Sequence, residues 1–137
     1  MVRHALVLAL ALALAPGCSA KKGTPEAVAD AFVDAYFRHA DQEHAKEFTA
    51  LGATEMMDKE IEDTKEIRKG GYTAADAAPE ITVRRGVPKP RDQRVRIPYE
   101  IRIRTDASHE VVRDADIELT KIDGAWKVVR VGLKPLS

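Results

Sequence analysis

Three polar side chains on otherwise apolar faces are the best candidates for a small-molecule site. Tyr36 and His39 supply the polar tips at the C-terminal end of an apolar helix face, and Tyr99 is the polar member of an aliphatic row on a strand. An apolar cavity with a few hydrogen-bonding groups is the usual composition of a ligand site. These residues therefore predict a site for a small, mostly apolar ligand between helix and sheet. A filled core is the alternative.

The same positions lack the carboxylates that an acid–base enzyme needs. The inward-facing strand residues are aliphatic apart from Tyr99, and Asp30 and Asp34 fall on the polar strip of the first helix. No G-x-S-x-G, phosphate-loop or dinucleotide motif occurs. We therefore predict no catalytic residues, no cofactor and a non-catalytic binding module. The alternative is a small isomerase- or hydratase-like enzyme that uses the pocket between helix and sheet.

One grouping of residues raises the question of a metal. His39, His44 and Glu47 are close in sequence, but Asp41 is expected to break the helix between them. No H-E-x-x-H or cysteine-based spacing occurs. The sequence therefore predicts no metal site.

A run of cations marks a second candidate surface, opposed locally only by Asp92. Its members are Arg84, Arg85, Lys89, Arg91, Arg94 and Arg96. Near an anionic membrane each such cation can add about 1 kcal/mol of attraction. We expect contact with anionic headgroups or another polyanion, with a solvated loop as the alternative. The formal net charge of zero gives no sign of a nucleic-acid partner.

The chain's single cysteine follows a short apolar segment. The eleven residues Ala5–Ala15 are too few to span a bilayer and are typical of a signal-peptide core. A lone cysteine in an exported protein cannot form an internal disulfide. Gly17-Cys18 resembles the processing site of bacterial lipoprotein signal peptides. This resemblance implies that Cys18 carries a diacylglycerol and becomes the first residue after cleavage.

That resemblance sets the expected organisation and location. We expect a signal peptide over residues 1–17, a tether over 18–23 and a single domain over 24–137. The lipid would hold the protein in the cell envelope, facing the periplasm, and Ser19 favours the outer over the inner membrane. An envelope protein is a further candidate partner. Plain secretion, with cleavage after Ala20, is the alternative.

Local signals predict three helices before any strand. Thr24 is a typical N-cap, followed by proline and an acid, and apolar residues recur at helical spacing as far as His39. Asp41 is expected to begin a short second helix that ends at Gly52. Thr54 is expected to begin a third, which stops before the next pair of glycines.

From residue 81 the apolar period changes to two, which predicts strands. A short strand around Ile81 precedes a long one from Arg94, in which Pro98 predicts an edge position or a bulge. Asp123-Gly124 predicts a hairpin turn. The last strand, from Ala125, has apolar residues on both faces, which predicts a bulge or a central position.

The segment TPEAVADAFVDAYFRHADQEHAKEFTALG, followed by strands ending in KIDGAWKVVRV, is similar to the nuclear transport factor 2-like (NTF2-like, cystatin-like α+β) superfamily. It is similar in particular to small bacterial lipoproteins of unknown function in that superfamily. The likeness covers Thr24 to Leu133. It implies N-terminal helices packed on a curved four-stranded antiparallel sheet, often around a conical pocket, and it implies no particular activity.

Overall fold

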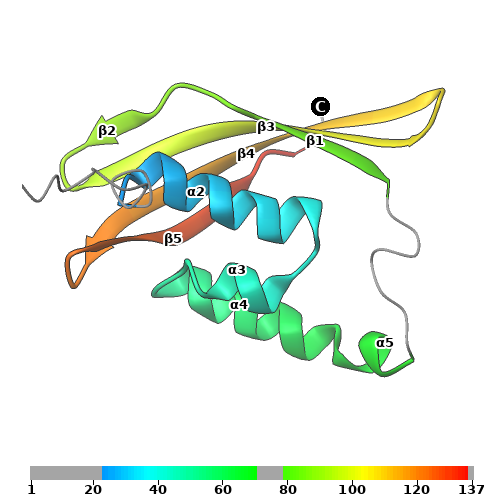
Figure 1. Cartoon of the computed structure of the whole chain (residues 1–137), viewed down its shortest axis with the longest axis horizontal. Coiled ribbons are helices and arrows are strands. Elements are labelled where there is room, and N and C mark those ends of the chain that lie inside the picture. Colours follow the sequence, from blue (N-terminus) through cyan, green and yellow to red (C-terminus); the bar gives the residue numbers. More distant parts are fainter. Residues whose placement is uncertain (1–22, 71–78, 136–137) are drawn as a thin grey trace, which may run out of the picture.

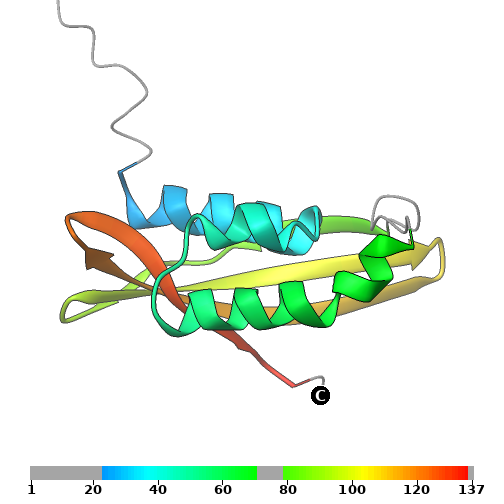
Figure 2. The ribbon, with the colours of Figure 1, turned by 90° about the horizontal axis from the view of Figure 1, so that it is seen from below.

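The computed structural model describes residues 23–70 and 79–135, where helices cover one face of an antiparallel sheet (Figures 1 and 2). The helical elements are α2 (Pro25–Val33), the π-helical turn η1 (Asp34–Arg38), α3 (Gln42–Lys46), α4 (Gly52–Asp63) and α5 (Lys65–Lys69). The strands are β1 (Glu80–Arg85), β2 (Lys89–Arg91), β3 (Arg94–Asp106), β4 (His109–Ile122) and β5 (Ala125–Leu133). The predicted α+β class is confirmed, and β2 adds a fifth, short strand to the four expected. No described helix is long and apolar enough to cross a membrane.

The first helix begins as predicted but changes its winding. Thr24 caps α2, because its Oγ1 accepts a hydrogen bond from the backbone N–H of Ala27 at 3.2 Å. In η1 the N–H of His39 bonds to the carbonyl of Asp34, five residues earlier, at 3.1 Å. Each π turn contains more residues than an α turn, so helical spacing no longer predicts which way later side chains point. His39 is therefore exposed, which corrects the expectation that it shares the apolar face.

The second helix ends earlier, and the third begins earlier, than the sequence predicted. Asp41 caps α3, as predicted, by accepting the N–H of His44 at 3.0 Å. The next residues then leave the helix and pair with β5. The N–H of Val128 donates to the carbonyl of Phe48, and the N–H of Ala50 donates to the carbonyl of Val128, both at 2.9 Å. Gly52 therefore starts α4 rather than ending α3.

The sheet places one apolar face against the helices. Its strand order is β1-β3-β4-β5, and β2 pairs with the same side of β3 as β1 does. Facing residues such as Ile97 and Ile117 on β3 and β4 are fully buried. α2 packs across β3, β4 and β5, and α4 packs on β5. Phe32 and Met57 from these two helices are fully buried in the same core.

Pro98 lies opposite an irregularity between β1 and β2, as the sequence predicts for a residue without an N–H donor. The N–H of Gly86 donates to the carbonyl of Pro98 at 2.7 Å. A Cβ on Gly86 would lie 2.8 Å from Pro98 Cγ, so only glycine fits this close approach. The segment between β1 and β2 therefore stays hydrogen-bonded to β3 at Gly86.

The interruption inserts one extra residue, which makes it a β-bulge. Arg85 lies opposite Tyr99, and Lys89 lies opposite Arg96. The chain therefore advances four residues from β1 to β2 while β3 advances three. Side chains alternate between faces along a strand. The extra residue therefore puts Lys89 and Arg91 on the outer face, away from the helices, while Arg85 points toward the helices.

The β4–β5 hairpin also agrees with its sequence signals. Asp123 and Gly124 have φ values of 51° and 80°, the left-handed pair that a tight two-residue turn requires. Further along, Leu119 faces Val128 but Glu118 faces Arg130, which leaves Val129 as an extra residue. The bulge predicted from apolar residues on both faces of this strand is thereby confirmed.

Candidate functional site

The Tyr36 side chain connects η1, which continues α2, to α4. Its Oη donates to Glu60 Oε1 at 2.7 Å, and its ring stacks on Phe32 with centroids 5.5 Å apart. Burial raises the pKa of the Tyr36 hydroxyl, and the bond to Glu60 raises it further. The hydroxyl is therefore a neutral donor that is already engaged.

The Tyr99 side chain makes an equivalent connection on the other side of α2. Its Oη donates to Asp30 Oδ1 at 2.7 Å, and Arg85 Nη1 lies 2.5 Å from Asp30 Oδ2. Burial raises the pKa of Tyr99, and the bond to Asp30 adds to the rise. The sequence had assigned Asp30 to a solvated strip. Only the fold brings it to a tyrosine 69 positions away.

The third predicted pocket residue lies elsewhere. The His39 side chain is 65% exposed, with Nε2 3.4 Å from Asp34 Oδ2. The structure therefore does not bring Tyr36, His39 and Tyr99 together around one cavity. The space expected to hold a ligand is occupied by fully buried side chains such as Phe32, Met57 and Ile97. This arrangement agrees with the filled-core alternative.

A cleft of about 550 Å³ does lie beside this core, between the first helical segment and β1. Its charged side chains neutralise one another: Asp30 pairs with Arg85, and Asp34 pairs with Arg38 at 2.9 Å. The cleft therefore offers a ligand no unmatched charge. Among the described residues, no group of three or more His, Cys, Asp or Glu side chains is placed to hold a metal ion.

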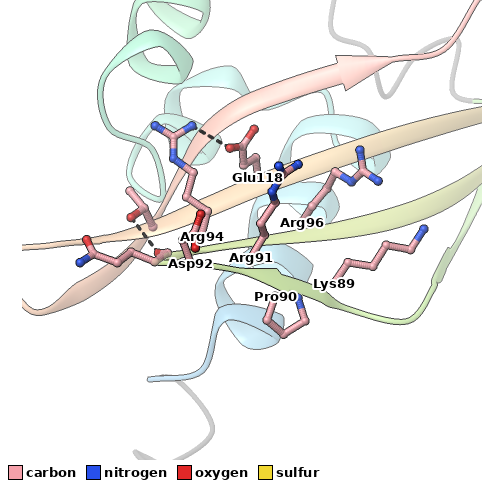
Figure 3. Close-up of a pocket in the computed structure, with 9 residues that line it drawn as sticks. Lys89, Pro90, Arg91, Asp92, Arg94, Arg96 and Glu118 are labelled. Carbon is pink, nitrogen blue, oxygen red and sulfur yellow. Dashed lines mark hydrogen bonds and ion pairs between the residues drawn. The ribbon is translucent and has the colours of Figure 1, made fainter.

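The outer face of the sheet carries a larger and more basic hollow, shown in Figure 3. This basic groove has a volume of about 830 Å³ and is formed by the β2–β3 hairpin and the adjoining part of β4. It is lined by Lys89, Pro90, Arg91, Asp92, Gln93, Arg94, Arg96, Glu118 and Thr120. The cationic side chains rise from the same side of β2 and β3 (Figure 3).

Most of the cations in the basic groove have no acidic partner. Arg94 Nη1 pairs with Glu118 Oε1 at 2.7 Å. Within the described part of the chain, Lys89, Arg91 and Arg96 make no ion pair. The groove therefore has a positive excess, even though Asp92 also lines it.

The structure separates the predicted cation run into two groups. Lys89, Arg91 and Arg94 gather in the basic groove, and Arg96 joins them. Arg84 and Arg85 do not. Arg84 Nη2 lies 3.3 Å from Glu100 Oε2, and Arg85 turns to the helix side to meet Asp30.

One member of the surface was missed from the sequence. Arg130 lies across from Glu118 and lines a smaller hollow of about 140 Å³ that shares Arg96 with the basic groove. Strand alternation could have placed it on the outer face, but the bulge at Val129 obscured the count. Cys18, the predicted lipidation site, lies outside the described residues.

Comparisons with known proteins establish the fold. No family model and no curated protein matches this sequence. A calcium/calmodulin-dependent protein kinase type II association domain from Thiobacillus denitrificans superposes with a TM-score of 0.59 at 15% identity, covering 83% of this chain and 96% of that one. A designed NTF2 chain gives 0.56 at 13% identity, covering 83% and 99%. Bdellovibrio bacteriovorus Bd1075 gives 0.50 at 18% identity, covering 80% of this chain and 38% of that one.

These likenesses show that the chain adopts an NTF2-like fold. At such low identity they carry no ligand or activity from one protein to another. The function must therefore be argued from the side chains of this chain's own site.

Proposed function

We propose that this NTF2-like domain is a lipid-anchored binding module of the cell envelope that adheres to an anionic surface through its basic groove. The anchor would be a lipid on Cys18, holding the protein on the periplasmic side of a membrane, with the outer membrane favoured. The observation that carries the binding role is the group of cations Lys89, Arg91 and Arg96, which line one groove and make no ion pair with any residue that the structure describes.

The position of the groove along the molecule supports this proposal. The N-terminal end of α2 lies at the same end of the molecule as the β2–β3 hairpin (Figures 1 and 2). The six residues from 18 to 23 can reach at most about 20 Å when extended. An anchor at Cys18 would therefore keep the groove close to the headgroups of the same membrane. There, cations add to the membrane affinity given by the lipid.

The side chains near the core favour binding over catalysis. A general base needs a carboxylate that is free to take a proton. Two carboxylates line the cleft: both oxygens of Asp30 are bound, by Tyr99 and Arg85, and Asp34 pairs with Arg38. The isomerase- or hydratase-like alternative therefore gains a tyrosine–carboxylate pair, but among the described residues of the cleft it gains no uncommitted base. The filled core also gives the small apolar ligand no space of its own.

Vesicle binding tests the proposed adhesion directly. The non-lipidated full chain should sediment with anionic vesicles at about 20 mM salt and be released at about 500 mM, because screening shortens the range of the attraction. The double variant Arg91→Glu, Arg96→Glu should lose this binding. Replacing two paired arginines of the same face, Arg102→Ala and Arg104→Ala, should retain it. Equal binding of the wild type to neutral vesicles, or unchanged binding of the groove variant, would overturn the proposal.

A further inference from the structure

We infer that the basic groove is a built site for a ligand carrying two or more phosphate-type anionic groups, an inference that uses the same groove as the proposed function. It goes further than surface adhesion. Adhesion needs only an excess of positive charge, whereas a site needs cations that the fold holds in a fixed arrangement.

The strand register holds the cations in like-charge pairs. Lys89 lies directly opposite Arg96, and Arg91 lies directly opposite Arg94, in two successive outward-facing rows of β2 and β3. Like charges directly opposite each other destabilise a sheet. The β2–β3 hairpin therefore contains a repulsion that a bound anion would relieve.

Elsewhere on the same face the arginines lie near acids, although one acidic like-charge pair, Glu100 opposite Asp114, also occurs there. Arg84 lies opposite Glu100, and Arg104 lies opposite Glu110. Arg102 bonds to Glu100 at 2.8 Å and to Glu110 at 2.9 Å. Along β1 and the far half of β3, the outer-face arginines therefore contact acids. In the groove, Arg96 lies opposite Glu118 on β4, but that carboxylate pairs with Arg94, so Lys89, Arg91 and Arg96 make no ion pair with any described residue.

The backbone contributes to this arrangement through the bulge that contains Gly86. Without the extra residue, Lys89 and Arg91 would point toward the helices, as Arg85 does. Bulges commonly re-aim side chains at functional positions. The two rows of cations therefore depend on a specific backbone feature rather than on a basic composition alone.

The spacing of the rows indicates the ligand class. Successive outward rows along a strand lie about 7 Å apart, and side chains directly opposite lie about 5 Å apart. Guanidinium groups bind phosphate through paired hydrogen bonds. One phosphate per row, on Arg91 in the first and on Lys89 with Arg96 in the second, fits these distances. Glu118 pairs with Arg94. Arg130 lies beyond Arg96, in a hollow that Asp116 and Glu118 also line.

Inorganic phosphates and one charge reversal test the site. For the non-lipidated full chain at matched ionic strength, tripolyphosphate should bind at least ten-fold more tightly than orthophosphate in calorimetry and should raise the melting temperature. Arg91→Glu should lower tripolyphosphate affinity at least ten-fold. It should also raise the melting temperature without ligand, because it replaces a like-charge pair with an opposite-charge pair facing Arg94.

Arg104→Glu is the matched control, since it makes the same substitution on the same face. It should lower the melting temperature, because it places two acids opposite each other at Glu110, and it should leave tripolyphosphate affinity unchanged. Equal affinity for orthophosphate and tripolyphosphate would overturn the site. So would an Arg91→Glu variant with unchanged melting temperature and affinity.

Competition separates this inference from the proposed adhesion and identifies the source of the phosphates. Displacement of tripolyphosphate by anionic vesicles supports the site and assigns it to lipid headgroups. Tripolyphosphate binding without vesicle binding supports the site for a soluble ligand and refutes adhesion. Vesicle binding with no measurable tripolyphosphate binding leaves adhesion standing and overturns the site.

Discussion

At the level of single residues, two tyrosine hydroxyls join the helices to the rest of the fold. Tyr36 bonds to Glu60 on α4, and Tyr99 on β3 bonds to Asp30 on α2. Each bond spans elements that are distant in sequence. We expect each to contribute about 1 kcal/mol at neutral pH, the usual net value of such a hydrogen bond.

These tyrosines predict a loss of stability in alkali. The pKa of each is raised in the folded state, so the folded protein keeps both protons when the unfolded chain begins to lose them at about pH 10. Their contribution to stability is therefore complete below about pH 10 and falls as pH rises above it. Urea unfolding at pH 8 and at about pH 11 should show this fall. The double variant Tyr36→Phe, Tyr99→Phe should lose less unfolding free energy between the two pH values. An equal loss in the variant and the wild type would contradict a role of the two hydroxyls in this pH dependence.

The residue scale is also where sequence reasoning was weakest. It identified Tyr36 and Tyr99 as polar groups on apolar faces, which they are, but gave their hydroxyls no partners. Asp30 and Glu60 lie 69 and 24 positions away from the tyrosines that they bind. No local pattern encodes such pairs, because they form only when the helices dock on the sheet and on each other.

At the level of elements, the bulge between β1 and β2 depends on one glycine. A Cβ on Gly86 would lie 2.8 Å from Pro98 Cγ and 3.2 Å from Pro98 O. Gly86→Ala should therefore destabilise the protein by about 1–3 kcal/mol through overpacking. It should also weaken anion binding, because β2 would shift against β3. Chemical unfolding and calorimetry measure the two effects.

Gly132 provides the control for this substitution. A Cβ there would meet its nearest atom, Asp116 O, at 3.8 Å, an ordinary contact. Gly132→Ala should change stability by less than about 0.5 kcal/mol. Equal effects of the two substitutions would show that the close approach at Pro98 does not constrain the chain.

Element boundaries were predictable where the signal is local. The caps at Thr24 and Asp41 and the Asp123-Gly124 turn depend on a few neighbouring residues, and all three form as expected. The π turn at His39 was not predicted, and the early end of α3 depends on tertiary contacts. In the second case, pairing of Phe48 and Ala50 with β5 removes residues that helical spacing would have kept in α3.

At the level of the whole molecule, the order of helices and strands was enough to predict the α+β class. Alternating strand residues predicted which face of β3 and β4 is buried. The basic cluster was recognised as a run in the sequence, but its division between the groove and the helix side could not be read there. That division depends on a single extra residue between β1 and β2, which reverses the face toward which the following side chains point.

The proposed anchor makes a prediction about the intact protein. Cys18→Ala should move the protein from the membrane fraction to soluble or unprocessed forms, because the acyl chains supply about 0.8 kcal/mol per buried CH₂. Cell fractionation and mass spectrometry of the N-terminus measure this. A mature wild-type protein that starts at Lys21 and carries no lipid would exclude the anchor.

The bulge also has a genetic consequence. Lys89 and Arg91 face outward because of how many residues follow Arg85, and their own identities do not set that direction. Loss of a single codon between these positions would keep every cation in the protein and still turn these two toward the helices. In diverging genes, the length of this short segment should therefore be a better marker of the groove than the number of basic residues around it.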